Sequence, residues 1–213
     1  MNYVAEVPVK LPFYKNARLR KMYVPQPANR SLLDMTLAWH CAPVLLGKKP
    51  AALFPKPAWW DALLPEKTAA GNLRFVTLRR NKTGLVFAYY PRLLSHALES
   101  GEACKTLGAL GYPVEAKYPE ERAARCLAFL ERRFRESGDF PHEVGFFLGY
   151  PPLDVLGFMR HRGSRYKLCG VWKVYSDVPK ATALFAEYAK CRERLVRHVQ
   201  NGGGLKPLCG LSL

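Results

Sequence analysis

The sequence predicts an α/β fold, with a mixed α+β arrangement as the open alternative. Segments with the apolar stripe of a helix alternate along the chain with short apolar runs of strand length. Two such runs, 73–78 and 85–89, flank the turn residues 81–84 in the pattern of a β-hairpin. Both runs are apolar on both alternating faces, so helices are expected on both sides of the sheet. We therefore expect a single domain over residues 31–199, with helices covering a mixed sheet of about five strands.

Capping residues and helix breakers set the expected bounds of each element. Ser31 is a candidate N-cap of the first helix, and Pro43 ends that helix because the residue before a proline disfavours helical backbone. Gly111 is the candidate C′ residue of the third helix, and Asp177 is the candidate N-cap of the last one. The expected helices are 31–41, 59–67, 91–110 with a break at Gly101, 120–136, 152–161 and 179–198. The expected strands are 50–54, 73–78, 85–89, 144–150 and 169–175.

Two segments are expected to lie outside this domain. Residues 1–30 form a basic arm in which several prolines interrupt any long helix, and residues 200–213 form a glycine-containing flexible tail. The N-terminus lacks the continuous apolar core of a secretory signal, and no apolar run is long enough to cross a membrane. A cytoplasmic location without membrane contact is therefore expected.

The composition favours anionic partners. The net charge of +16, from 33 basic and 17 acidic residues, attracts phosphates, acidic proteins and anionic small molecules without choosing among them. The six cysteines form no CxxC or other metal-ligand spacing, so no metal site is expected. The glycine-rich and nucleophile-elbow motifs of the common nucleotide-binding proteins and esterases are absent from the sequence.

The first candidate for chemistry is the pair His40 and Cys41, at the end of the first expected helix. A histidine beside a cysteine suggests a general base and a nucleophile. It also suggests a redox or haem-linked site in which these residues serve as a ligand or a reactive thiol. The alternative is core packing, because both residues extend the apolar face of Leu33 and Leu37, and adjacent helical residues point about 100° apart. A haem or flavin cofactor stays open at this point.

The second candidate is the stretch from Phe140 to Asp154. His142 and Glu143 are candidates for proton transfer, although the HExxH zinc spacing is absent. Gly149, Tyr150 and Asp154 lie where the expected strand 144–150 meets the expected helix 152–161, and such junctions present backbone N–H groups to anions. Close backbone packing is the alternative role of the glycines.

Two cations are candidates to neutralise an anion at this junction. Lys173 lies in the last expected strand and shares one face with Tyr175, and Arg92 follows another strand-to-helix junction. An outward-facing Lys173 would instead be an ordinary surface lysine.

Three segments carry a resemblance to a known family: HCAP at 40–43, FPHEVGFFLGYPPLDVLGF at 140–158 and GVWKVYSD at 170–177. Over about residues 31–192 the chain resembles the bacterial family known as domain of unknown function 3793, which is typical of anaerobic Firmicutes. The resemblance implies no established activity, so it assigns no catalytic residue. It implies a link to iron or redox physiology, since such genes often lie near flavodoxins and iron-uptake genes.

These observations lead to one main hypothesis and several alternatives. The main one is a domain that binds an anionic small molecule near Gly149 and Tyr150, with enzymatic activity left open. One alternative is a nucleic-acid-binding protein that uses its basic surface and the arm 1–30. A second is a redox or haem-linked protein that uses His40 and Cys41. A third is a non-catalytic partner of an acidic, flavodoxin-like redox protein.

Overall fold

Three antiparallel strands form the central sheet. The computed structural model describes residues 29–63, 72–80 and 83–205, so most of the arm, the end of the expected helix 59–67 and the last tail residues lie outside the described residues. The strands β1 (Ala51–Pro55), β2 (Arg74–Arg80) and β3 (Thr83–Tyr89) are arranged in the order β1-β3-β2. The predicted hairpin is confirmed as β2 and β3, which pair from Arg74 with Tyr89 to Arg80 with Thr83.

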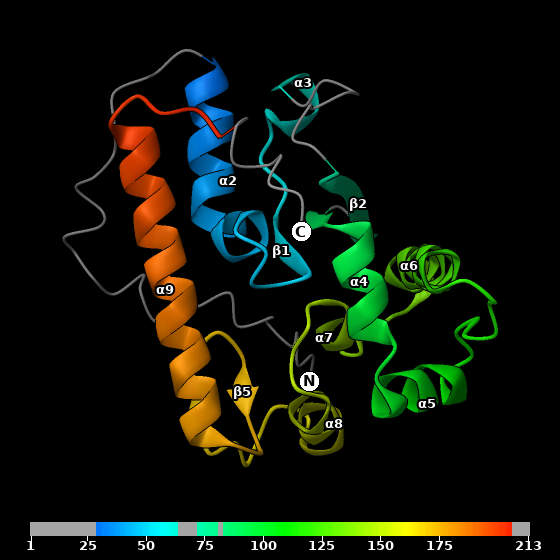
Figure 1. The fold of residues 1–213 in the computed structure, drawn as a ribbon. Helices are drawn as coiled ribbons and strands as arrows, with labels where there is room; N and C mark the ends of the chain where they lie inside the picture. The colour runs from blue at the N-terminus through cyan, green and yellow to red at the C-terminus, as the bar shows by residue number, and fades with distance from the viewer. Residues whose placement is uncertain (1–28, 64–71, 81–82, 206–213) are drawn as a thin grey trace.

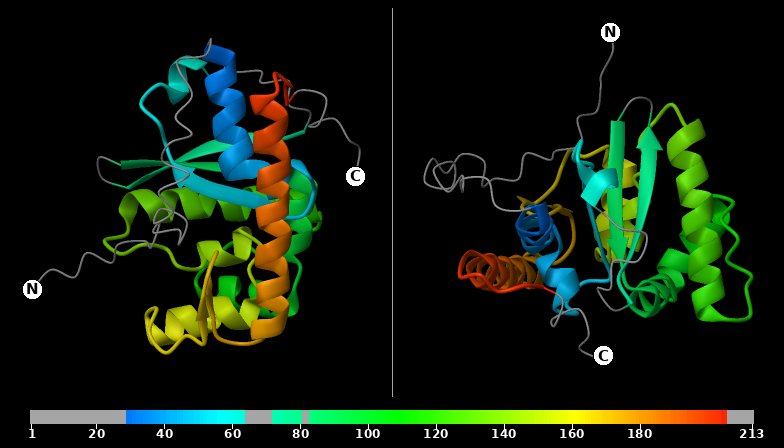
Figure 2. Two further views of the ribbon diagram at one scale, coloured as in Figure 1. Left: turned by 90° about the vertical axis from the view of Figure 1, so that its left-hand side faces the viewer. Right: turned by 90° about the horizontal axis from the view of Figure 1, so that it is seen from above.

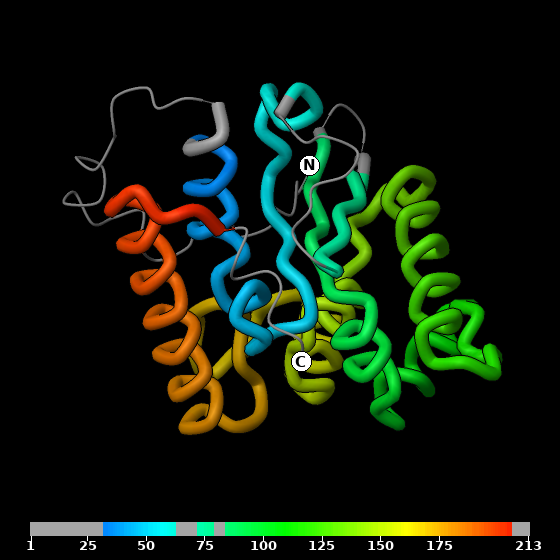
Figure 3. Tube along the Cα trace, turned by 45° about the horizontal axis from the view of Figure 1, so that its top comes forward, coloured from blue at the N-terminus to red at the C-terminus, as the bar shows by residue number. Residues whose placement is uncertain are grey.

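Helices cover both faces of this sheet, as the sequence predicts (Figures 1 and 2). On one face lie α2 (Asn29–Leu45) and α9 (Val178–Gln200), which run side by side (Figure 3). On the other face lie α4 (Pro91–Leu98) and α6 (Pro119–Glu136). Alternate residues of β3 serve the two cores: Val86 and Ala88 pack with α2 and α9, whereas Phe87 packs with α4 and α6. The α/β fold class is thereby confirmed.

The prediction of one mixed sheet of about five strands is wrong in two places. Residues 144–150 form the helical turn α7 (Val144–Phe147) and its C-terminal cap, because this buried run is apolar on every side and has no period that separates strand from helix. Residues 169–175 do not form one strand: they contain the end of β4 (Leu168–Cys169), a turn and all of β5 (Lys173–Val174), which form a separate two-stranded hairpin. All strand pairs in the described residues are antiparallel.

Three short helices complete the described part of the chain together with α7. They are α3 (Trp60–Leu63), α5 (Gly101–Ala109) and α8 (Pro152–His161). The break expected near Gly101 is confirmed, since Ser100 caps α5 by accepting a hydrogen bond from the backbone N–H of Ala103. Gly111 follows α5 at φ +83°, and Asp177 caps α9 by accepting from the N–H of Lys180. Within the described parts of the chain, no helix is both long and apolar enough to cross a membrane.

The first helix continues past the predicted end at Cys41, with Pro43 inside it. Proline has no backbone N–H, so the carbonyl of Trp39, four residues earlier, loses its helical partner. Arg192 of α9 supplies the missing donor, with its Nε 3.0 Å from the Trp39 oxygen and its guanidinium 5.6 Å from the centroid of the Trp39 ring. Pro43 and Arg192 therefore form a matched pair that ties α2 to α9.

Candidate functional site

Asp154 anchors the β4–β5 hairpin to α8. Its carboxylate is only 2% exposed and accepts hydrogen bonds at 2.8 Å from the indole N–H of Trp172, the backbone N–H groups of Tyr175 and Ser176, and the Ser176 hydroxyl. Both carboxylate oxygens are thus occupied by protein donors. Asp154 lies in the predicted site, and its contacts make it a positioning residue that fixes Trp172.

Trp172 in turn holds an aromatic wall. Its ring stacks on Tyr150 with centroids 4.8 Å apart, meets Phe185 edge-on at 4.6 Å, and lies 6.5 Å from Tyr188. These rings come from the α7–α8 connection, the β4–β5 hairpin and α9. The wall therefore joins two of the sequence motifs, LGYP and GVWKVYSD, with the last helix.

Lys49, which the sequence analysis did not single out, completes this arrangement. Its ammonium nitrogen lies 4.9 Å from the ring centroid of Tyr150 and 6.0 Å from that of Tyr188. The residue is only 9% exposed, and no carboxylate of the described residues forms an ion pair with it. We call Lys49, Tyr150, Trp172 and Tyr188 the Lys49 junction.

Burial dominates the electrostatics of Lys49. Loss of hydration lowers its pKa to about 8, with the nearby Cys41 opposing this shift and Arg192 adding to it. Burial also raises the pKa values of the Tyr150 and Tyr188 phenols, so both keep the O–H donor at neutral pH. The Lys49 ammonium therefore lies beside two uncharged phenol rings.

The HCAP motif lies beside the Lys49 junction. His40 stacks on Phe54, with ring centroids 4.6 Å apart, and burial together with the Arg192 charge lowers its pKa to about 4. Its imidazole is therefore neutral at pH 7. Cys41 is fully buried in the core between α2, the sheet and α9. No disulfide joins the cysteines of the described residues.

Gly149 allows the α2–β1 connection to reach the junction. It adopts φ +71°, and a Cβ atom there would lie 2.6 Å from two ring carbons of Pro50. The predicted strand-to-helix junction is a helix-to-helix junction, between α7 and α8. In the first turn of α8, the N–H groups of Asp154 and Val155 donate to the Pro151 carbonyl, so these amides are already paired.

The predicted proton-transfer pair, His142 and Glu143, contacts two different parts of the fold. Glu143 is buried, with one oxygen 2.6 Å from Arg133 Nε and 2.9 Å from the Tyr112 hydroxyl that donates to it. It ties α6 to the start of α7. The imidazole of His142 packs against Phe158 of α8, with ring centroids 4.7 Å apart.

The two predicted cations are also placed apart from Lys49. Lys173 donates from its ammonium to the Gly163 carbonyl at 2.6 Å, just beyond the end of α8. Arg92 is exposed in the first turn of α4, at the strand-to-helix junction that the sequence predicts. Lys173 forms no ion pair within the described residues.

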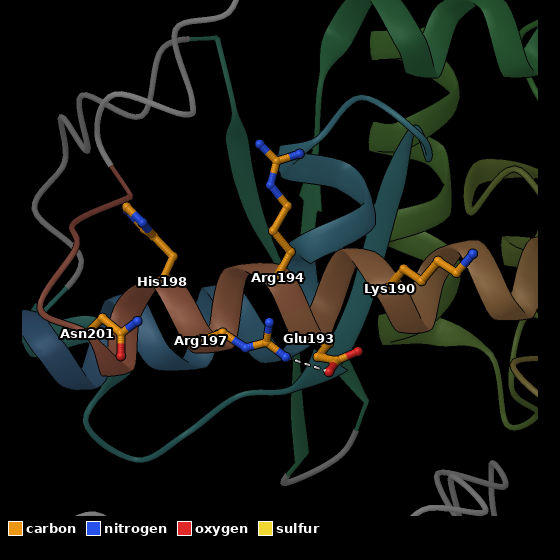
Figure 4. Close-up of a pocket in the computed structure, with 6 residues that line it drawn as sticks. All are labelled: Lys190, Glu193, Arg194, Arg197, His198 and Asn201. Carbon is orange, nitrogen blue, oxygen red and sulfur yellow. Dashed lines mark hydrogen bonds and ion pairs between the residues drawn. The ribbon is translucent and has the colours of Figure 1, made fainter.

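A shallow hollow lies on the exposed face of α9 near its C-terminal end (Figure 4). Its lining is Lys190, Glu193, Arg194, Arg197, His198 and Asn201. Arg197 pairs with Glu193 at 2.7 Å, while His198 and Arg194 point to the same side of the helix.

In the described part of the chain, no three His, Cys, Asp or Glu side chains are grouped to hold a metal ion.

Comparison with known families confirms the family that the sequence resembles. The family described as "Protein of unknown function (DUF3793)" matches residues 37–209. The chain belongs to this family. The match to the DUF3793 family includes every residue of the Lys49 junction and begins after the basic arm. Neither the curated proteins nor the solved structures contain a match to the chain.

Sequence reasoning missed Lys49 and Arg192. Arg192 directly follows Cys191, which lies on the buried stripe of α9. An arginine at the edge of a buried stripe is a signal that its side chain could contact a neighbouring helix. Lys49 follows another lysine and precedes Pro50, a pattern typical of a surface turn. Only the tertiary packing of Tyr150 and Tyr188 over it reveals its burial.

Proposed function

We propose that this chain binds a small anionic molecule at the Lys49 junction, with the Lys49 ammonium as the recognising cation. The observation that carries the proposal is a buried ammonium with no acidic partner among the described residues. Burying an unpaired charge is costly, so such a group either loses its proton or pairs with an anion. With a pKa of about 8, Lys49 is roughly 90% protonated at pH 7, which favours anion binding over nucleophilic attack.

The surroundings of Lys49 suit a carboxylate or phosphate group. The phenols of Tyr150 and Tyr188 can donate hydrogen bonds to the oxygens of such a group. Tyr150 is half-buried and the preceding Gly149 is exposed, so the junction reaches the surface along this edge. Tyr150 keeps the ligand-binding role predicted from the sequence, whereas Gly149 and Asp154 are proposed to position the site. Lys49 replaces Lys173 as the cation, because the Lys173 ammonium already donates to the Gly163 carbonyl.

A thermal-shift assay tests this proposal. The full chain is heated with phosphate, pyrophosphate, succinate or ATP at constant ionic strength, and the same panel is applied to Lys49→Met and Lys48→Met. Lys48 is the matched control because it is the adjacent lysine, is exposed and pairs with Glu187 at 3.1 Å. We expect at least one anion to raise the Tm of the wild type and of Lys48→Met but not of Lys49→Met. An equal response of Lys49→Met, or no response of the wild type, contradicts the proposal.

The link to iron or redox physiology stays a prediction. Cys41 is fully buried, so a partner or oxidant reaches this thiol only if α2 moves away from the sheet. The visible absorbance spectrum of the protein, purified anaerobically, tests for the haem or flavin that this prediction includes. Bands that disappear on replacing Cys41 or His40 support it, and a spectrum without visible bands counts against it.

A further inference from the structure

A second cationic feature lies at the end of α8, away from Lys49. Residues 160–167 read RHRGSRYK, and Arg160, Arg162, Arg165 and Lys167 are all exposed. From residue 155 to residue 176 the sequence contains no carboxylate. The positive charge of this segment is therefore not neutralised by its own chain neighbours. We call residues 160–167 the basic loop.

Ion pairing separates the basic loop from the exposed arginines of α6. On α6, Arg125 pairs with Glu121 at 2.6 Å and Arg135 pairs with Glu131 at 3.0 Å. None of the cations of the basic loop forms a salt bridge within the described residues. These two α6 arginines thus have a carboxylate one turn away, whereas the cations of the basic loop are exposed without one among the described residues and suit an external polyanion. Lys167 donates to the Ser176 carbonyl at 3.0 Å, which leaves its charge unneutralised.

The backbone conformation of the basic loop also indicates a function for its arginines. Arg162 and Arg165 adopt φ values of +49° and +57°, the left-handed region that glycine or asparagine occupies more easily. They are the two non-glycine residues with positive φ in the described part of the chain. The dipole at the C-terminus of α8 favours Arg160 and Arg162, but it does not reach Arg165 or Lys167. Strained positions held by arginine suggest a use for the side chains.

An exposed aromatic side chain lies among these cations. Tyr166 is 44% exposed, and the ammonium of Lys173 lies 4.9 Å from the centroid of its ring. Because the Tyr166 side chain is exposed, a flat apolar group can approach its ring from solvent. Cations that contact phosphates, interleaved with an aromatic ring on which a base stacks, are typical of single-stranded nucleic-acid binding.

We propose that the basic loop binds single-stranded nucleic acid, with its arginines on the phosphate backbone and Tyr166 stacked on a base. This surface is independent of the Lys49 junction. It differs from the basic arm predicted from the sequence, because it consists of the end of α8 and the connection from α8 to β4.

The test is fluorescence anisotropy of the full chain with a labelled RNA of about 20 uridines. The variant Arg162→Gly/Arg165→Gly removes two charges at positions where glycine fits the backbone, so folding is preserved. The matched control, Arg125→Ala/Arg135→Ala, removes the same charge from α6. We expect the loop variant to weaken binding about tenfold or more and to reduce the slope of log K against log salt by about 1.4, and the control to change binding by about twofold or less.

Tyr166→Leu separates stacking from charge. We expect it to weaken binding of the single strand about tenfold and to leave binding of a duplex of equal length unchanged. Equal weakening by the loop and control variants would show a general effect of net charge and overturn the proposal. Failure of the wild type to bind the RNA, or displacement of the RNA by phosphatidylserine vesicles at lower concentration than by competitor RNA, would overturn it as well.

Discussion

Replacing Lys49 with methionine is expected to stabilise the protein while removing its anion site. The pKa of Lys49 falls from 10.5 in the unfolded chain to about 8 in the fold, and this difference corresponds to a cost of about 3 kcal/mol for burying the charged amine. Attraction to the rings of Tyr150 and Tyr188 returns about 1 kcal/mol of this cost. Methionine has a similar length and no charge, so Lys49→Met should raise the free energy of unfolding by about 2 kcal/mol at pH 7.

The difference in stability between Lys49→Met and the wild type should depend on pH. Between pH 8 and 10.5 the unfolded lysine holds a proton that the folded one has lost, so the stability of the wild type rises with pH across this window. The advantage of Lys49→Met should shrink over the same range.

Urea denaturation at pH 7 and at pH 10 measures both effects, with Lys48→Met as the control. Lys48 is exposed in its ion pair with Glu187, so its replacement should change stability by about 0.5 kcal/mol or less. A Lys49→Met variant that is less stable than the wild type at pH 7 would show that the buried amine is favourably paired, and would contradict this prediction.

Three further predictions concern the frame of the site. Arg192→Met leaves the Trp39 carbonyl unpaired and should lower the free energy of unfolding by about 2 kcal/mol. The loss should be smaller in a Pro43→Ala background, because the alanine supplies an N–H to the same carbonyl. Equal losses in the two backgrounds, measured by urea denaturation, would show that Arg192 does not compensate for Pro43. Asp154→Ala removes the acceptor of four hydrogen bonds and should cost about 4 kcal/mol, so a loss below about 1 kcal/mol would show that the hairpin is held by other contacts. Below pH 6.5 His40 binds a proton in the unfolded chain but stays neutral in the fold, where its pKa is about 4. The free energy of unfolding should therefore fall by about 3 kcal/mol between pH 6.5 and pH 4. In an acid titration His40→Phe should show a smaller fall, and a profile identical to that of the wild type would contradict this prediction.

Local signals in the sequence were sufficient for much of the fold. Turn residues between two apolar runs identified the β2–β3 hairpin, and capping by Asp177 identified the start of α9. Gly111 was correctly placed at a left-handed helix end. Each of these features depends on residues a few positions apart, which is why the sequence alone reveals them.

Features that depend on distant contacts were not predicted. The run 144–150 is buried on all sides, so its pattern could not distinguish the helical turn α7 from a strand, and the strand count was overestimated as a result. The first helix passes Pro43 because Arg192, far away in sequence, satisfies the free carbonyl. Of the proposed site, the sequence singles out Tyr150, whereas the burial of Lys49 becomes visible only when α9 and the α7–α8 connection pack over it.

The most direct test of the anion-binding proposal is the pKa of the Lys49 amine, followed by NMR of the full chain with labelled lysine side chains. We expect a pKa of about 8 for Lys49 in the free protein, and an upward shift of this pKa when the anion that raises the Tm is added, because an anion beside the ammonium favours its protonated form. A pKa near 10.5 in the free protein, or a pKa of about 8 that the anion leaves unchanged, would contradict the proposal that Lys49 is a buried cation awaiting an anionic ligand.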